Sequence, residues 1–252
     1  MQIGTETVLA VFILFCRIGT CIMLMPAFSS TRIPPRIRLF LALGVTLVLA
    51  PLLIGDVQGA LARASLRAAA GILISEMLIG AMIGIVGRLF FLALETLANA
   101  ATMAVGFGAV PGTAIEDPDP QPAMVSLITI SAVVLLFITD LHWEILRGLR
   151  ASYEVLPVTQ AFGPQAALMR VADALAEGFL VALRVTSPFI IYAVVVNFAI
   201  GLTNKLTPQI PIYFISLPLI LLGGLFLLYF IAPEMLHLFT DGFTTWLATG
   251  WL

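Results

Sequence analysis

The run LRAAAGILISEMLIGAMIGIVGRLFFLALETLANAAT, residues 66–102, decides the fold class of this chain. It contains no proline and is mostly apolar, so it predicts one continuous α-helix. At a rise of about 1.5 Å per residue this helix is ~55 Å long, whereas the hydrocarbon core of a bilayer is ~30 Å thick. We therefore expect a helix that is too long to be a simple membrane span.

Charged side chains lie in the middle of this run and of a later one. Glu76, Arg88 and Glu95 fall within the first run, and Arg184 falls within the apolar residues 178–203. A charge at the bilayer centre costs between ~2.5 and ~10 kcal/mol, depending on the reference state. We expect these four side chains to be buried against polar groups, within the chain or at contacts with partner subunits, and not to face lipid.

The composition is that of a membrane protein. Hydrophobic residues make up 61% of the 252 residues and charged residues 10%, whereas soluble domains have about 45–50% and about 25%. The net charge of −2 leaves no basic stripe for nucleic acid. Six apolar runs predict an all-α protein with five or six spans; they cover residues 8–28, 39–55, 68–94, 123–139, 178–203 and 211–232.

The positive charges do not indicate how such spans are oriented. If Arg32, Arg36 and Arg38 are cytoplasmic, strict alternation puts a comparable number of arginines on the other side. Either one span is miscounted, or the final fold does not weave through a bilayer. A second helix also looks too long and too mixed for a span, because residues 123–154 contain no proline and become amphipathic toward their end.

Two smaller patterns concern packing within the helices. Gly80 and Gly84 form a glycine pair four residues apart, which allows two helix backbones to approach closely. Cys16 and Cys21 are the only cysteines, and on a helix they point about 140° apart. We expect no disulfide between them and two buried thiols.

Residues 178–232 predict a kinked helical hairpin. Pro188 and Pro218 lie inside its two apolar runs, where proline kinks a helix. Between the runs stands the polar segment NKLTPQIP, residues 204–211, whose two prolines indicate a tight turn. We predict that Asn204, Lys205, Pro208 and Gln209 of this turn contact a partner protein.

The loop 104–122 is rich in glycine, proline and acidic residues and separates two long helices. Polar, irregular backbone at membrane depth is tolerated only in water or along a cavity. One interpretation is a segment inserted in a pore, and the other is an exposed surface loop. Glu116, Asp117 and Asp119 of this loop suit solvent better than a metal site, because the alternating prolines hold it stiff and extended.

Motifs for chemistry are missing from the sequence. We find no Walker A sequence and no HExxH spacing, and His142 and His237 stand far apart. We therefore expect no catalytic residues, no metal and no cofactor. Two rival functions stay open at this point: a small-solute or ion transporter with a polar site at the midplane, and an intramembrane enzyme.

Several short segments, taken in order, resemble a known family over nearly the whole chain. They are Phe15-Cys16-Arg17, Pro26-Ala27-Phe28-Ser29, Ile33-Pro34, Arg38, residues 76–80, the loop 103–122, His142, Ser152-Tyr153, Pro157, residues 197–205, Pro208-Gln209-Ile210-Pro211 and Phe214. This pattern resembles the FliR family, subunits of the flagellar type III export gate with a counterpart in virulence secretion. Leu141 before His142 and Asn204-Lys205 in the turn depart from the family's usual residues.

The resemblance implies an architecture and a set of partners. Residues 1–175 would be similar to the FliP subunit and residues 176–252 to FliQ, as a kinked hairpin with a C-terminal tail. One such chain would complete a helical ring around a pore for unfolded flagellar proteins, with FlhB and FlhA as further partners. The gate would belong to the inner membrane and the flagellar basal body, displaced toward the periplasm. The turn with Asn204, Lys205, Pro208 and Gln209 would face the cytoplasmic entrance of the gate, with a partner such as FlhB.

In this architecture the loop 104–122 would correspond to the plug that closes the pore at rest. The residues we assign to the plug are Met103, Gly106, Phe107, Gly108, Pro111 and Gly112.

Overall fold

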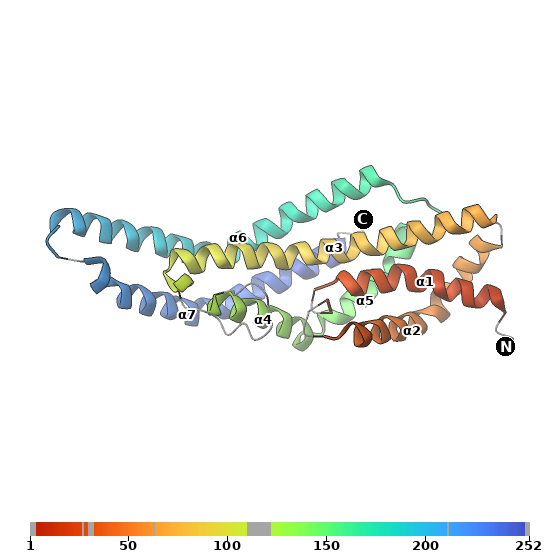
Figure 1. Ribbon diagram of the computed structural model, residues 1–252, viewed down its shortest axis with the longest axis horizontal. Helices are drawn as coiled ribbons and strands as arrows, with labels where there is room; N and C mark the ends of the chain where they lie inside the picture. Colours follow the sequence, from red (N-terminus) through yellow and green to blue (C-terminus); the bar gives the residue numbers. More distant parts are fainter. Residues whose placement is uncertain are drawn as a thin grey trace. The chain divides into compact units, whose positions relative to one another are not determined.

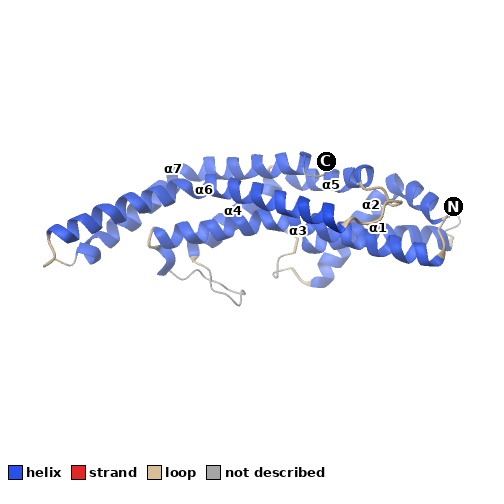
Figure 2. Cartoon of the chain, turned by 90° about the horizontal axis from the view of Figure 1, so that it is seen from above, coloured by secondary structure: helices blue, strands red, loops and turns tan. Residues whose placement is uncertain are grey.

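The computed structural model describes residues 4–249 apart from residues 27, 30–32, 63, 110–121 and 211. In this part of the chain the regular elements are seven α-helices and one short 3₁₀ turn (Figures 1 and 2). They are α1 (Thr5–Leu24), α2 (Pro35–Leu61), α3 (Leu66–Ala104), η1 (Phe107–Ala109), α4 (Ala123–Ile138), α5 (Leu141–Val155), α6 (Pro164–Leu206) and α7 (Ile212–Thr249). The all-α prediction is confirmed.

Five helices are long and apolar enough to cross a membrane, or six if the bent pair α4 and α5 counts as one span, among the residues described. The sequence predicted the same number. Three helices far exceed the bilayer core: α3 has 39 residues, α6 has 43 and α7 has 38. At about 1.5 Å per residue, α6 is ~65 Å long against a core of ~30 Å.

The long helix α3 was predicted from Leu66 to Thr102 and is confirmed, ending two residues later at Ala104. It begins where the Ser65 hydroxyl accepts a hydrogen bond from the backbone N–H of Ala68, which satisfies one of the unpaired donors at the helix start. It ends before Gly106, whose φ of 88° lies in the left-handed region that favours glycine.

The single helix predicted for residues 123–154 is wrong. The structure has two helices there, α4 and α5, whose axes differ by 73°. Asp140 causes the break, because its φ of 58° is left-handed and cannot continue an α-helix. Aspartate adopts this conformation more readily than most residues do. The sequence has no glycine or proline at this position that would have indicated the break.

The hairpin predicted at residues 178–232 is confirmed as α6 and α7 (Figure 1). Pro188 lies inside α6 and leaves the carbonyl of Arg184 without its helical donor. The Ser187 hydroxyl donates to that carbonyl at 2.9 Å, so the helix passes the proline without an unpaired group at this point. The predicted kinks at Pro188 and Pro218 rest on prolines that lie inside both helices.

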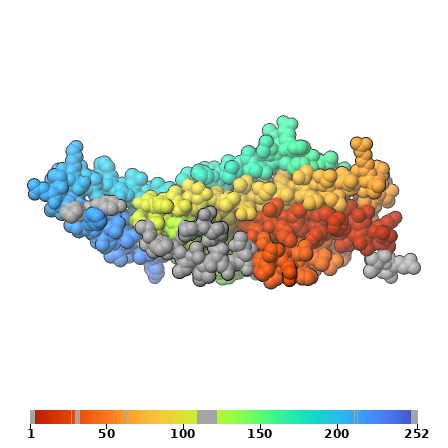
Figure 3. Space-filling view, viewed as in Figure 1, coloured from red at the N-terminus to blue at the C-terminus, as the bar shows by residue number. Residues whose placement is uncertain are grey.

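The chain groups into two compact units. Unit 1 comprises Met1–Leu89, Asp140–Leu175 and Thr244–Leu252, and unit 2 comprises Phe90–Thr139 and Ala176–Phe243. Within unit 1, α1 and α2 pack against each other (Figure 3, red and orange). The predicted division at residue 175 concerns similarity to other subunits, and it stays a prediction.

Unit 2 has an aromatic interior where the second half of α3 meets α7. Phe91 lies edge-on to Phe239 and to Phe243, with ring centroids 5.1 Å and 5.9 Å apart. Phe90 meets Phe243 in the same manner at 5.9 Å. All four rings are buried, and such edge-to-face pairs add about 0.5–1.5 kcal/mol each beyond the buried area.

Candidate functional site

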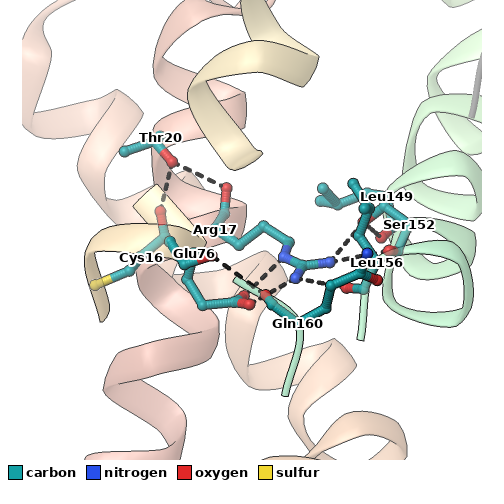
Figure 4. A network of polar contacts seen from close by, with 9 residues as sticks. Cys16, Arg17, Thr20, Glu76, Leu149, Ser152, Leu156 and Gln160 are labelled. Carbon is teal, nitrogen blue, oxygen red and sulfur yellow. Dashed lines mark hydrogen bonds and ion pairs between the residues drawn. The ribbon is translucent and has the colours of Figure 1, made fainter. Parts of the chain in front are cut away.

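The most concentrated polar chemistry in unit 1 is an ion pair in its interior. The side chains of Arg17 on α1 and Glu76 on α3 are 0% and 1% exposed. Arg17 donates from Nε to one carboxylate oxygen of Glu76 at 2.7 Å and from Nη2 to the other at 2.6 Å. This two-pronged geometry is the strong form of an arginine–carboxylate contact (Figure 4).

Arg17 also binds the end of α5. Its Nη1 donates to the backbone oxygen of Ser152 at 3.0 Å and to that residue's hydroxyl at 3.3 Å, and its Nη2 donates to the backbone oxygen of Leu156 at 2.9 Å. The last carbonyls of a helix have few internal partners and carry partial negative charge, so a cation there is stabilising. The ring of Tyr153 covers the guanidinium at 3.9 Å.

Glycines on α3 make this contact possible by letting α1 come close. A Cβ at Gly80 would overlap the backbone oxygen of Arg17 and the hydroxyl of Thr20. One turn further, a Cβ at Gly84 would lie 2.8 Å from the backbone oxygen of Cys21. The predicted close approach of helices at this glycine pair is confirmed, and Glu76 lies one turn before it on the same helix.

The arrangement is suited to holding three elements together and not to chemistry on a substrate. Each guanidinium nitrogen already donates to a buried oxygen, so no donor remains for a ligand. Removing one member of such a pair leaves a buried charge uncompensated, at a cost of roughly 3–5 kcal/mol. Within the described residues, no three His, Cys, Asp or Glu side chains are grouped to hold a metal ion.

The four charged residues predicted to be buried differ in their exposure. Glu76 is fully buried and has Arg17 as its partner. Arg88 on α3 and Arg184 on α6 are exposed in this chain, and Glu95 is half-buried. For Arg88 and Arg184 the predicted burial therefore does not occur inside the chain, and it remains a prediction about neighbouring subunits.

Arg17 was missed as a site residue, although its sequence position carried a signal. It is the only charge inside the first apolar run, residues 8–28, as Glu76 is the first charge inside the third. A cation and a carboxylate embedded in separate apolar helices are candidates for a pair, because each is costly in an apolar setting without a partner. The two cysteines of α1 are buried and not bonded to each other, as predicted.

The first residue assigned to the plug is helical and does not belong to a loop. Met103 belongs to the last turn of α3, not to a loop, and it is 60% exposed. Gly106 provides the left-handed end of the helix, and Phe107 and Gly108 form the 3₁₀ turn η1. Pro111 and Gly112, like the acidic residues Glu116, Asp117 and Asp119, lie outside the described residues.

The root of this segment is anchored within unit 2. A Cβ at Gly224 of α7 would overlap Cγ1 of Val105 and would lie 3.0 Å from Cε2 of Phe107. Val105 is fully buried. The side-chain amide of Asn197 on α6 donates to the backbone oxygen of Ala104 at 3.4 Å, at the end of α3. Glycine at position 224 is thus what lets α7 receive the residues that follow α3.

The four residues predicted for the hairpin turn divide between helix and turn. Asn204 and Lys205 are in the last turn of α6, while Pro208 and Gln209 lie in the turn proper. All four are exposed. Lys205 is the basic residue at the C-terminal end of α6, where a cation complements the helix dipole.

These features define the class of protein: a helical membrane protein with span-length helices, whose most buried polar cluster is structural and not catalytic. A family model described as bacterial export proteins, family 1, matches residues 8–246. The flagellar biosynthetic protein FliR of Caulobacter vibrioides is 30% identical over 232 residues, which cover 91% of this chain and 90% of that relative.

Two further relatives with the same name agree with this match. FliR of Pectobacterium carotovorum is 27% identical over 91% of this chain and 88% of its own length. FliR of Escherichia coli K12 is 25% identical over 86% of this chain and 84% of its own length. The chain belongs to bacterial export protein family 1, the FliR family, and is a non-enzymatic membrane component of the flagellar export apparatus. This membership decides against the transporter and the intramembrane enzyme.

Proposed function

We propose that the chain forms part of the wall of the protein-conducting pore in the flagellar export gate, together with FliP-like and FliQ-like subunits. The carrying observation is that long apolar helices leave charged and apolar side chains exposed together. Arg184 is exposed on α6, and the neighbouring Leu180 and Ile191 are 55% and 63% exposed. Lipid suits the two apolar side chains but not the arginine, whereas a neighbouring subunit offers surfaces for both.

The large apolar surface supports the same proposal. In the part of α7 from Phe214 to Leu247, only 11% of an apolar stretch of 18 residues is buried. In the corresponding stretch of α6, 28% is buried. Contiguous exposed apolar surface marks contacts with protein or membrane. Helices of ~57–65 Å cannot be covered by a ~30 Å hydrocarbon core alone, so protein neighbours would cover the remainder.

The partners and the position come from the resemblance to the family. We propose FliP and FliQ as ring neighbours, FlhB and FlhA as further contacts, and unfolded flagellar proteins as the cargo in transit. The gate would be displaced from the inner membrane toward the periplasm, which gives the overlong helices a place outside lipid. The turn with Lys205 and Gln209 would face the cytoplasm and contact FlhB.

The plug remains part of this proposal. Met103, Gly106, Phe107 and Gly108 would carry it, and Pro111 and Gly112 would belong to its continuation. The glycine at position 106, in the left-handed region with open space beside it, supports a change of chain direction there. Deleting residues 106–111 in an assembled gate should raise leakage of ions or small solutes across the inner membrane.

The test of the proposed function is a native mass measurement of the complex purified in mild detergent through a tag on this chain. We expect a mass several times the 27.0 kDa of one chain, with other export subunits in fixed stoichiometry. A chain recovered only as a monomer, from cells that export flagellar proteins normally, would contradict the proposal. Crosslinkers at positions 205 and 209 that capture only lipid would contradict the proposed orientation.

A further inference from the structure

Unit 2 has two exposed helix faces of different character. The exposed face of α7 is apolar: Leu219, Leu222, Phe226 and Phe230 are 62–68% exposed. The second half of α3, from Phe90, is also an apolar helix, but its outer face carries polar side chains between the exposed Leu92 and Met103. We call Glu95, Thr96 and Asn99 the polar stripe.

Helix geometry places these three residues on one side. Thr96 and Asn99 are exposed and Glu95 is half-buried, and positions 95 and 99 are one turn apart. The opposite side of the same helix is the packed one, where Ala98 is 0% and Ala101 is 3% exposed. The polar stripe is thus directed away from the interior of unit 2.

The hydrogen bonds of Thr96 and Asn99 differ. The Thr96 hydroxyl donates to the backbone oxygen of Leu92 at 2.7 Å and is satisfied within the helix. The side-chain amide of Asn99 has no hydrogen-bond partner among the described residues. An amide without partners is unfavourable in an apolar medium and costs nothing in water.

We propose that the polar stripe lines the water-filled path along which unfolded polypeptide passes, an inference that rests on the proposed pore function. An aqueous border accounts for an exposed amide, an exposed hydroxyl and a carboxylate on a helix that is otherwise apolar. Amide and hydroxyl groups hydrogen-bond to any peptide backbone without regard to its sequence. A path for many different polypeptides needs contacts of this kind.

The experiment measures thiol reactivity in the assembled gate. Asn99→Cys is introduced into the full chain, and the complex is exposed in membranes to a negatively charged, membrane-impermeant methanethiosulfonate reagent. The native cysteines give little background, because Cys16 is 7% and Cys21 is 0% exposed. Leu219→Cys on α7 is the control for an exposed but apolar position, and Ala98→Cys is the control for a buried one.

We expect Asn99→Cys to react about tenfold faster or more than Leu219→Cys, because the thiolate reaction needs water at the thiol. Ala98→Cys should not react. A stalled export substrate in the gate should slow the reaction at position 99 and leave the rate at position 219 unchanged.

Several outcomes would overturn the inference. Equal rates at positions 99 and 219 in an assembled gate would show that the stripe does not border water, while the proposed function would stand. If position 99 reacts fast and a stalled substrate does not slow the reaction, the stripe borders water but does not line the path of the polypeptide. Thr96→Cys serves as the second variant. If neither variant assembled although the unmodified chain did, the stripe would be a packing surface and the proposal would be wrong.

Discussion

Helices α1 and α7 have nearly the same hydropathy but very different burial. The mean hydropathy of their most apolar windows is 2.3 and 2.4, yet 50% of that window is buried in α1 and 11% in α7. The first has one embedded charge, Arg17, which pairs with Glu76 inside unit 1. The stretch of α7 from Ile212 to Pro233 has no charge at all.

The difference shows what hydropathy leaves undetermined. Apolar content indicates that a helix avoids water. It does not indicate whether the apolar side chains pack against the same chain or against another molecule. A buried ion pair is stable only in a narrow range of geometries. The pair of Arg17 and Glu76 therefore holds α1 against α3 and the end of α5. The stretch of α7 from Ile212 to Pro233 has no charge to form such an ion pair, and it leaves its large side chains exposed.

The largest expected effect tests the buried pair of α1. Arg17→Ala or Glu76→Ala should lower the stability of the chain by roughly 3–5 kcal/mol, because the remaining charge is left buried without its partner. Thermal unfolding in detergent measures the loss. Arg147→Ala is the control, since its pair with Glu144 is exposed and should contribute about 0.5 kcal/mol or less. Equal effects at positions 17 and 147 would remove the distinction between the two helices.

The next effect concerns the close approach of α1 and α3. Gly80→Ala should cost about 1–3 kcal/mol, because its methyl group would overlap backbone of Arg17 that cannot easily move. The matched control is Gly71→Ala in the same helix, where nothing lies within 4 Å. That change should stabilise α3 by ~0.5–1 kcal/mol. If both changes stabilised the chain, the glycine contact would not hold α1 in place.

A smaller effect is expected in unit 2. Gly224→Ala should cost about 1–2 kcal/mol, because the nearest atoms that its methyl group would meet belong to the side chains of Val105 and Phe107 and not to the backbone. Gly201→Ala on α6 is the control, with nothing within 4 Å. The same melting experiment compares the two. A loss at position 224 as large as that at position 80 would mean that α7 is held as rigidly as α1.

The smallest effect on the chain itself belongs to the outer face of α7. Phe226→Ala should change the stability of the isolated chain by no more than about 0.5 kcal/mol, since the ring is 67% exposed. Recovery of the multi-subunit complex should nevertheless fall, because a neighbour loses an aromatic contact. Unfolding and co-purification are measured on the same preparation. Unchanged recovery would argue that lipid and not protein covers this face.

Periodicity and proline placement were enough to predict most of the fold. The uninterrupted α3 and the proline-bearing turn after α6 followed from local rules. The corner at Asp140 did not, because a left-handed aspartate leaves no distinctive mark in the sequence. The cost of a charge in an apolar helix was enough to select Glu76. The sequence did not show which helix lies beside it, so the pair with Arg17 could not be assigned.

The surface charges could be recognised but not assigned. Arg88 and Arg184 occupy apolar runs as Glu76 does, yet they are exposed in this chain. A sequence shows which residues are costly in lipid, whereas the molecule that relieves the cost can be a separate subunit. The contact between Gly224 and the residues that follow α3 was equally hidden, since over a hundred positions separate them in the chain.

The most direct test of this account is photo-crosslinking from α7 in living cells. A photoreactive phenylalanine replaces Phe226, and Ile22, which is 4% exposed, provides the buried control position. We expect irradiation to join this chain to another export-apparatus subunit from position 226 and to give no intermolecular product from position 22. Recovery of lipid adducts alone from position 226, in a complex that still exports flagellar proteins, would contradict the claim that neighbouring subunits cover α7.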